Sequence, residues 1–407
     1  MRYLEQTARS YGPVAQFPVP VPPSYLVTSA SGAQHVLVAN ARNYGKRTIQ
    51  YSALSLVTGE GLLTADTQQW KDRRRIVQPA FHHASISLID AHVARALQKL
   101  LAELKAQDGQ IIDVDAAMMH MALDIVGGAL FGTDLSGDAA EFAQATLNAL
   151  DVVVARARMP LSPPGWVPTR NNLKLNRALR KIDAAVTKIL NGRRGPIPEQ
   201  PRDMLDLLLA AHSDDTTSLT AQQVRDEIVT FIVAGHETVA SALTWTWQLL
   251  ATNPSAYDRL IVEADQDREA TWAKAVFDEA LRMYPPAWLI TRNAIESDVI
   301  EGVEIPAGAL IIMSPWVVHR DPEYWDQPNV FNPERFVDPR HNRSAYFPFG
   351  AGPRLCIGRD MALLEARLIL HGVSKHIRFE AVEPDVQAVP LVTIRPKDGL
   401  HMRVHVR

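Results

Sequence analysis

Apolar residues recur at helical spacing through most of the chain. The two clearest early patterns predict helices over residues 86–106 and 114–130. A longer pattern begins at Thr220, which forms a capping box with Gln223, and it contains no proline before Pro254. About thirty residues at about 1.5 Å each would span roughly 45 Å, the width of a domain. We therefore expect this helix to cross the core of the protein.

Shorter segments alternate apolar and polar residues and predict small sheets near both ends of the chain. Residues 24–39 predict a strand, a turn at Ser31-Gly32 and a short helix. The other expected elements are a helix over residues 274–283, a strand over 288–294, a hairpin turning at 306–308, and a C-terminal hairpin of 389–394 with 401–405 turning near 398–399. The patterns together predict a mainly α protein with small β-sheets, arranged as a single domain over residues 1–407.

A proline-rich stretch over residues 159–168 interrupts the helical patterns and predicts a loop. Helical patterns resume directly after it, so we interpret it as a mobile cover rather than a domain boundary. Its large apolar side chains, Met159, Leu161 and Trp166, are candidates for contact with lipid.

Composition narrows the class of protein. A net charge of -3 over 407 residues argues against nucleic acid as the main partner. A single cysteine rules out an intramolecular disulfide and favours a reducing cytoplasm. The first six residues contain no apolar run, so we expect neither a signal peptide nor a membrane anchor. The expected location is the cytoplasm, with peripheral contact with a membrane left open.

The single cysteine, Cys356, lies in the sequence Phe349-Gly-Ala-Gly-Pro-Arg-Leu-Cys-Ile-Gly358. A thiolate near neutral pH needs a positive charge or a metal close by, and Arg354 is two residues away. Gly350, Gly352 and Gly358 would allow the backbone to approach a flat group, against which Phe349 could also lie. The alternative is a buried, inert thiol.

The pattern F-x-x-G-x-R-x-C-x-G resembles the haem-binding loop of the cytochrome P450 family. The resemblance implies a P450 fold in which the long helix and the cysteine loop sandwich haem b, whose iron takes the Cys356 thiolate as axial ligand. It also implies that Phe349, Gly350, Arg354 and Gly358 contact the haem. Residues 48–55 with 58–64, residues 234–245 and residues 279–292 are similar to the β-carotene hydroxylase branch of this family from thermophilic bacteria.

The long helix carries a second motif, Ala234-Gly-His-Glu-Thr238. Gly235 in a helix interior costs about 1 kcal/mol relative to alanine, which suggests a close approach to the backbone there. Ala234 and Thr238 share one face because they are four residues apart. The motif resembles the oxygen-activation segment of the family, which implies that Thr238 and Glu237 manage protons beside bound O2 and that Ala234 and Gly235 adjoin the cofactor. The alternative is an ordinary core helix.

A zinc site of the His-Glu type is excluded at this motif. Such a site needs a second histidine four residues after His236, and position 240 is alanine.

The two propionates of a haem need cations, and arginine binds carboxylates with a planar, permanently charged fork. Trp70 and Arg74 resemble the W-x-x-x-R pair that the family directs at the propionates. Arg292 and Arg354 are the other candidates at family positions. For any one of these arginines alone, an ordinary surface role would be the default.

Glu279 and Arg282 are three residues apart on an expected helix, a spacing typical of solvated pairs. They resemble the E-x-x-R element of the family, which implies a buried network with Arg335. We assign this trio a structural role behind the cysteine loop, and no part in acid–base catalysis.

Lys71, Arg73, Arg74 and Arg75 form a basic cluster on one expected helix. Most such clusters are simply solvated, and that remains the alternative. The functional interpretation is a docking surface for an acidic electron donor such as a ferredoxin. One cysteine cannot hold an iron–sulfur cluster and no flavin module is visible, so electrons from NAD(P)H must arrive through a separate ferredoxin and reductase.

The resemblance implies a monooxygenase that uses O2 to hydroxylate a lipophilic substrate, with a carotenoid such as β-carotene as the first candidate, at C3 or C2. Candidate substrate contacts are Gln50, Tyr51, Leu63, Trp288, Leu289 and Ile290. Each of these side chains could equally fill the core. The alternatives are a P450 that hydroxylates fatty acids or another lipophilic molecule, a haem–thiolate isomerase or dehydratase, and a non-catalytic haem sensor.

Overall fold

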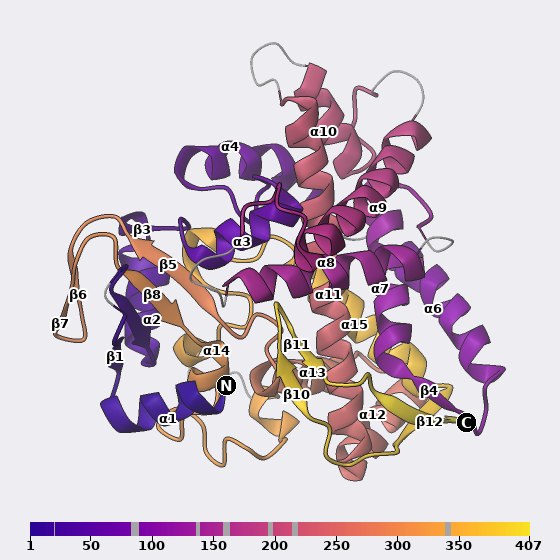
Figure 1. Ribbon diagram of the computed structural model, residues 1–407. Coiled ribbons are helices and arrows are strands. Elements are labelled where there is room, and N and C mark those ends of the chain that lie inside the picture. The colour runs from indigo at the N-terminus through magenta and orange to yellow at the C-terminus, as the bar shows by residue number, and fades with distance from the viewer. Residues whose placement is uncertain are drawn as a thin grey trace. The chain divides into compact units, whose positions relative to one another are not determined.

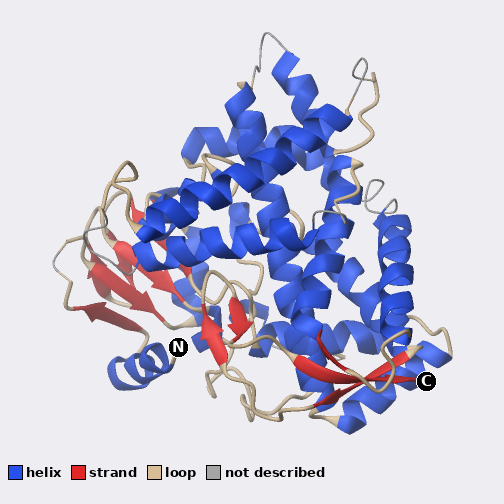
Figure 2. Cartoon of the chain, turned by 45° about the vertical axis from the view of Figure 1, so that its right-hand side comes forward, coloured by secondary structure: helices blue, strands red, loops and turns tan. Residues whose placement is uncertain are grey.

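The computed structural model describes residues 1–19, 21–82, 89–135, 139–157, 163–193, 198–213, 219–337 and 343–407. About 58% of the chain is helical and the sheets are small, so the predicted fold class is confirmed (Figure 2). The chain divides into two compact units. The first consists of residues 1–48, 101–115 and 241–407, and the second of residues 49–100 and 116–240. The single domain expected over residues 1–407 stays a prediction.

The main sheet belongs to the first unit (Figure 1). Its strand order is β1-β2-β8-β5-β3, and β2 runs parallel to β8 whereas the other neighbours are antiparallel. The strands are β1 Val14–Phe17, β2 Ser24–Val27, β3 Tyr44–Gly45, β5 Ile290–Ala294 and β8 Leu310–Met313. Apolar side chains of β2, β5 and β8 are buried in one cluster with those of the helix that follows β2.

The hairpin expected at residues 306–308 is displaced. The hairpin of this region joins β6 Asp298–Ile300 to β7 Val303–Ile305 and turns at Glu301-Gly302, where both residues have positive φ. Residues 306–308 instead lead into β8, which pairs with β5. The glycine at Gly302 fits the left-handed backbone of that turn at no steric cost.

The expected C-terminal hairpin is also wrong in its pairing. Strand β10 Ala388–Pro390 pairs with β11 Ile394–Pro396, so the turn lies between these two short strands. Strand β12 His401–Val406 pairs with β4 Ile111–Asp113 on one side and β9 Ile377–Ala381 on the other. Alternation of apolar residues marked both segments as strands but carried no information about their partners.

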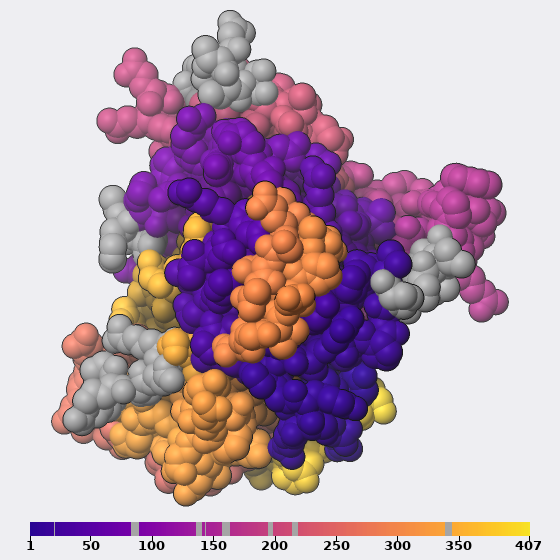
Figure 3. Space-filling model, turned by 90° about the vertical axis from the view of Figure 1, so that its left-hand side faces the viewer, coloured from indigo at the N-terminus to yellow at the C-terminus, as the bar shows by residue number. Residues whose placement is uncertain are grey.

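Ser31 and Gly32 lie inside a helix, not in the predicted turn. Helix α2 Ala30–Gln34 begins after Ser29, whose side chain accepts a hydrogen bond from the Gly32 N–H. It continues into a π-helix, His35–Ala39. The β6–β7 hairpin holds this segment, because Glu301 accepts hydrogen bonds from Ser29 and Ser31. Figure 3 shows the hairpin (orange) lying on the surface of the N-terminal segment (indigo).

The first unit also contains most of the short helices. Helix α13 corresponds to the predicted helix over 274–283. The helices are α1 Arg2–Tyr11, α12 Pro254–Asp265, α13 Thr271–Met283, α14 Pro315–Val318 and α15 Arg359–Ser374, with 3₁₀ turns at Ala41–Asn43, Pro333–Phe336, Arg343–Ala345 and Gly352–Arg354.

The second unit is built from helices, and it contains most of each of the two early predicted helices, which are confirmed. They correspond to α6 Ile89–Lys105 and α7 Val114–Phe131; the expected start of the first falls in 83–88, outside the described residues. The other helices are α3 Ile49–Thr58, α4 Thr67–Val77, α8 Ala139–Ala157, α9 Arg170–Gly192 and α10 Met204–Ser213, with a 3₁₀ turn at Gln78–Phe81.

Part of the proline-rich stretch is described, and it contains neither helix nor strand over residues 163–169. The buried Asn172 side chain holds it by donating hydrogen bonds to the carbonyl oxygens of Pro164 and Val167, at 2.8 and 2.7 Å. Met159 and Leu161 lie outside the described residues.

The longest helix, α11 Ala221–Ala251, confirms the prediction of a helix of about thirty residues (Figure 1). Its capping box is present: the Thr220 N–H donates to Gln223 Oε1 at 2.8 Å, and the Gln223 N–H donates to Thr220 Oγ1 at 3.2 Å. By length and composition, α7 and α11 could each cross a membrane. However, 78% and 83% of their apolar windows are buried inside the protein, which is typical of core helices.

Candidate active site

The cysteine loop ends directly before helix α15. The Cys356 N–H donates to the Phe349 carbonyl oxygen at 3.0 Å, which closes the loop, and Gly358 is the N-cap of α15. The Cys356 side chain is exposed. Because the N-terminal end of a helix carries partial positive charge, this position stabilises a thiolate and makes its sulfur available as a ligand.

The glycines of the loop serve different purposes. Gly350 has φ +71, and a Cβ added there would have only Ile290 Cδ1 near it, at 3.9 Å. Gly352 has φ +70, and its added Cβ would lie 1.9 Å from the Leu37 carbonyl oxygen. The close approach at Gly352 is therefore made by the π-helix His35–Ala39, and not by a flat cofactor as the sequence suggested.

The structure brings Glu279, Arg282 and Arg335 together. Arg282 donates two hydrogen bonds to the Glu279 carboxylate, at 2.7 and 2.8 Å, and Arg335 Nε lies 3.3 Å from Glu279 Oε1. The side chains of Glu279 and Arg282 are both 0% exposed. Arg282 also donates to the carbonyl oxygens of His319 and Pro328, so one guanidinium fixes several backbone segments of the first unit.

His319 connects this network to the cysteine loop, and sequence reasoning missed it. It is fully buried, with Nδ1 3.2 Å from the Arg282 carbonyl oxygen and Nε2 accepting from the Phe347 N–H at 3.0 Å. Burial, followed by the charge of Arg282, lowers the pKa of His319 to about 3. No motif singled out this residue, because the hydrogen bonds join segments that are distant in sequence.

Two of the predicted propionate ligands belong to the first unit. Arg292 lies on β5 and is buried, and its Nη1 donates to the Thr291 carbonyl oxygen at 2.7 Å. Arg354 ends the 3₁₀ turn of the cysteine loop and is half-buried.

The Ala234–Thr238 motif, predicted to activate oxygen, interrupts the buried surface of α11. From Asp226 to Leu250, the residues that are not buried are Ala234, Gly235 and Thr238. The Thr238 hydroxyl donates to the Ala234 carbonyl oxygen at 2.7 Å, and Glu237 is buried. A small residue and a hydroxyl therefore share an accessible face in the middle of a core helix.

The approach to the backbone at Gly235 is made by a neighbouring helix. An added Cβ would lie 2.8 Å from Val126 Cγ2 of α7. Helix packing thus accounts for this glycine, and its contact with the cofactor stays a prediction.

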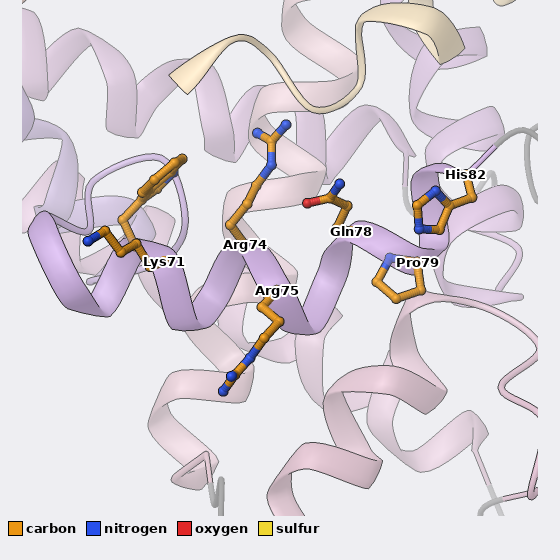
Figure 4. A pocket seen from close by; sticks show the side chains of 7 residues that line it. Lys71, Arg74, Arg75, Gln78, Pro79 and His82 are labelled. Atoms are coloured by element: carbon orange, nitrogen blue, oxygen red, sulfur yellow. The ribbon is translucent and has the colours of Figure 1, made fainter. Parts of the chain in front are cut away.

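Trp70 and Arg74 lie on α4 and line a shallow cavity of about 390 Å³ with Lys71, Arg75, Gln78, Pro79 and His82. Figure 4 shows Arg74 and Gln78 projecting from one side of α4 and Arg75 from the opposite side. Lys71 and Arg75 are exposed.

Arg73 does not belong to an exposed basic cluster, which corrects the prediction of a docking surface that includes it. Its side chain is 4% exposed, and Nη1 lies 3.1 Å from Oε1 of the buried Glu227 on α11. Because α4 turns by about 100° per residue, adjacent cations face different sides, and one of them faces the interior.

The candidate substrate residues fall into two groups. In the second unit, Gln50 and Tyr51 lie in the first turn of α3, and Leu63 lies in the loop between α3 and α4; all three are half-buried. In the first unit, Ile290 is in the core cluster and approaches Gly350, and Leu289 is half-buried.

Trp288 is more constrained than the sequence suggested. Its Nε1 donates to the Leu391 carbonyl oxygen at 2.9 Å, and its own carbonyl accepts from the Ser314 hydroxyl at 2.9 Å. The ring packs with a cluster around Trp245 and Trp316. Much of its surface therefore fills the core.

Comparison with known proteins places these features in one family. The cytochrome P450 profile matches residues 1–400. The chain is 32% identical to cyclooctatin synthase of Streptomyces melanosporofaciens over 93% of this chain and 84% of that protein. It is 31% identical to the LUTEIN DEFICIENT 5 protein, chloroplastic, of Arabidopsis thaliana, over 95% of this chain and 71% of that protein.

Solved structures agree with this result. CYP175A1 from Thermus thermophilus matches with a TM-score of 0.78 and 31% identity, over 99% of this chain and 94% of that chain. A six-coordinated cytochrome P450 from another strain of Thermus thermophilus matches equally well, over 98% of its chain. The protein belongs to the cytochrome P450 family of haem–thiolate monooxygenases.

The chain has the residues that such a cofactor needs. Its one cysteine is exposed at the N-terminal end of α15, and a left-handed glycine in the same loop leaves space beside the backbone. Among the described residues, no cluster of three or more His, Cys, Asp or Glu side chains forms an alternative metal site.

Proposed function

We propose that this P450 hydroxylates the β-ionone ring of a carotenoid such as β-carotene, at C3 or C2. The observation that carries the oxygenase part is the accessible face at Ala234 and Thr238 in an otherwise buried stretch of α11. Similarity to the LUTEIN DEFICIENT 5 protein, whose name refers to a carotenoid, supports a carotenoid, as does the resemblance of residues 234–245 and 279–292 to the β-carotene hydroxylase branch. The half-buried apolar side chains at Tyr51 and Leu63 suit a long hydrocarbon.

In this proposal Cys356 holds the haem iron, and Arg74, Arg292 and Arg354 bind the propionates. When bound, a thiolate-ligated haem supplies an electron-rich iron that favours cleavage of the O–O bond of O2. The protein's own contribution is proton management. The Thr238 hydroxyl donates its proton to the Ala234 carbonyl oxygen, so it would have to break this hydrogen bond before it could donate into the accessible space beside Ala234. Glu237, next in sequence, would restore the proton.

The proposed electron source is a ferredoxin reduced by an NAD(P)H-dependent reductase. Lys71 and Arg75 are the exposed cations of α4 that could attract an acidic partner.

The proposed location is the cytoplasm with peripheral contact with a membrane, which would give access to a membrane-dissolved substrate. Trp166 is 84% exposed on a loop that Asn172 holds in place. Arg170, Leu173 and Arg177 continue from it along one exposed face of α9, and Leu173 is 52% exposed. A tryptophan beside arginines suits the interface of an anionic bilayer. Binding to vesicles that contain phosphatidylglycerol should weaken in Trp166→Ser.

The substrate proposal is tested by incubating the holoprotein with β-carotene, ferredoxin, reductase and NADPH. Hydroxylated products identified by mass spectrometry and NMR, and dependent on the electron donor, would support it. Products from lauric acid but not from carotenoids would instead favour the fatty-acid alternative. Turnover without a donor would favour an isomerase or dehydratase.

A further inference from the structure

The segment of residues 58–64, which consists of the last residue of α3 and most of the loop that leads to α4, contacts one turn of α11 and is called the 58–64 loop below. The Glu60 N–H donates to Asp226 Oδ2 at 3.1 Å, and the Leu62 N–H donates to Glu227 Oε2 at 3.1 Å. Two backbone amides of the loop are thus held by consecutive carboxylates of the helix. All of these residues belong to the second unit.

The two glycines of this loop allow the contact. A Cβ added at Gly59 would lie 2.2 Å from Asp226 Oδ1, and one added at Gly61 would lie 2.1 Å from Thr230 Oγ1. Gly59 also has φ +61, which other residues rarely adopt. The close contacts at both glycines therefore leave the loop little freedom to shift along α11 or away from it.

The two carboxylate oxygens of Glu227 accept hydrogen bonds from two different segments, the 58–64 loop and helix α4. Oε2 accepts from the loop, and Oε1 accepts from Arg73 Nη1 of α4 at 3.1 Å. The side chains of Arg73 and Glu227 are 4% and 0% exposed. A buried ion pair of this kind contributes little net stability, because desolvation offsets the attraction. Its effect is to hold α4 and the 58–64 loop in one position on α11.

The position of the 58–64 loop on α11 affects the part of the site where we expect the substrate to bind. Thr230, Ala234 and Thr238 follow one another at intervals of four along α11, so the loop rests on the face that leads to Ala234. The loop contains Leu63, a candidate substrate contact. Arg73 precedes Arg74, a candidate propionate ligand, on the same helix.

We propose that Glu227 and Arg73 are positioning residues that fix the 58–64 loop on α11 and thereby determine which position of the substrate is oxidised. The inference rests on the proposed function in one respect, the placing of Leu63 beside the substrate. Burial raises the pKa of Glu227 to about 7, against the lowering effects of the Leu62 N–H and Arg73. Because Arg73 is the ion-pair partner of Glu227, its removal leaves a buried carboxyl without that partner.

The test uses the haem-loaded protein and the variants Arg73→Met, Glu227→Leu, Glu227→Gln and the Arg73→Met/Glu227→Leu double variant. The matched control is Lys174→Met/Asp151→Asn, an ion pair of the same unit whose side chains are 41% and 49% exposed. Hydrogen exchange of a peptide covering residues 58–64 reports the loop directly and requires no substrate.

We expect exchange of this peptide to accelerate at least about fivefold in Arg73→Met and Glu227→Leu, and less in Glu227→Gln, which keeps an acceptor for the Leu62 N–H. The ratio of hydroxylation positions should change in the same order, with a larger effect on KM than on kcat. The double variant should recover stability, because an apolar pair can replace a buried ion pair, but it should not recover the ratio of products.

Exchange equal to that of the control pair would overturn the inference. So would faster exchange with unchanged product positions, because the loop would then not control the substrate. If the wild-type protein oxidises lauric acid and not β-carotene, only the carotenoid proposal fails. The variants are then compared by the positions hydroxylated on lauric acid.

Discussion

The imidazole of His319 receives the Phe347 N–H at its Nε2 atom, 3.0 Å away, two residues before the cysteine loop begins at Phe349. Since Nε2 accepts, the proton of the neutral ring lies on Nδ1, which faces the Arg282 carbonyl oxygen at 3.2 Å. One ring thus joins the backbone of the Glu279–Arg282 pair to the backbone that leads into the thiolate loop.

His319→Phe should loosen the cysteine loop, because it leaves the buried Phe347 N–H and Arg282 carbonyl without their partner. Each unsatisfied group costs about 1 to 3 kcal/mol. In the reduced, carbon monoxide-bound protein, we expect a several-fold larger share of haem without the red-shifted Soret band of thiolate ligation. His319→Gln should lose less of that band. His405→Gln, at an exposed pair with Glu380, is the control, and a His319→Phe spectrum like the control's would contradict the prediction.

Glu365 on α15 predicts a dependence of stability on pH. The side chain is buried, no hydrogen bond reaches its Oε1 within the described part of the chain, and desolvation raises its pKa to about 8. The folded state therefore keeps a proton that the unfolded state has lost, so this group lowers the free energy of unfolding as pH rises from about 4.5 to 8.

Glu365→Gln should flatten that decline by an amount on the order of 5 kcal/mol across the interval. Urea unfolding of the two proteins at several pH values measures the difference. Glu380→Gln, whose carboxylate is 61% exposed, should follow the wild-type curve. Parallel curves for Glu365→Gln and wild type would show that the buried carboxyl does not titrate in this range.

Gly352→Ala should disrupt haem binding, although Gly352 itself has no side chain that could act on the cofactor or the substrate. The added Cβ would meet the Leu37 carbonyl oxygen at 1.9 Å, and φ is +70. Relief requires the cysteine loop to separate from the π-helix His35–Ala39. We expect a clear loss of haem content per protein, measured by absorbance. Gly302→Ala has a similar positive φ but nothing within 4 Å, so it isolates backbone strain from the clash. Equal haem content in both variants would disprove the proposed packing role.

Among the basic residues of α4, Lys71 and Arg75 should affect the rate at which ferredoxin reduces the haem, whereas Arg73 should affect stability. Lys71→Gln/Arg75→Gln should slow reduction several-fold at low salt and very little at high salt, because exposed charges are screened. Stopped-flow reduction at two ionic strengths measures this. Arg73→Met should instead change stability, since Arg73 is buried against Glu227. A salt-independent effect of the double variant would argue against a docking surface at Lys71 and Arg75.

Thr238→Ala should divert electrons into peroxide while haem binding remains intact. The substitution removes the hydroxyl that shares the accessible face with Ala234. We expect product formed per NADPH to fall by about tenfold or more, since acid–base groups commonly contribute at least that much. Thr238→Ser keeps the hydroxyl and should retain most of the coupling. Wild-type coupling in Thr238→Ala would remove this residue from proton delivery.

Local signals in the sequence were sufficient for α11, its capping box and the cysteine loop, because each depends on residues close together in the chain. Strand pairing was not predictable in the same way. One of the two partners of β12 is β4, nearly 290 residues earlier by register, and nothing in either short segment specifies the other. The turn assigned to Ser31-Gly32 was wrong because the Ser29 cap converts the same residues into a helix.

In the site too, local contacts could be predicted from the sequence and contacts between distant segments could not. The spacing of Glu279 and Arg282 indicated their contact, whereas His319 and Glu227 act through backbone groups that no motif encodes. Arg73 was misassigned because a cluster of basic residues on one helix shows charge but not the direction in which each side chain points.

The order of the strands in the main sheet has a consequence for biosynthesis. Strand β2 leaves the ribosome early, but its parallel neighbour β8 is encoded more than 280 residues later, as the pairing of Val27 with Met313 shows. At about 5–20 residues per second, translation imposes a delay of roughly 15 to 55 seconds between the two. Strand β2 can pair early with β1, but its other edge must wait for β8 while the second unit is made, and fragments that stop before β8 would expose that edge to chaperones or aggregation.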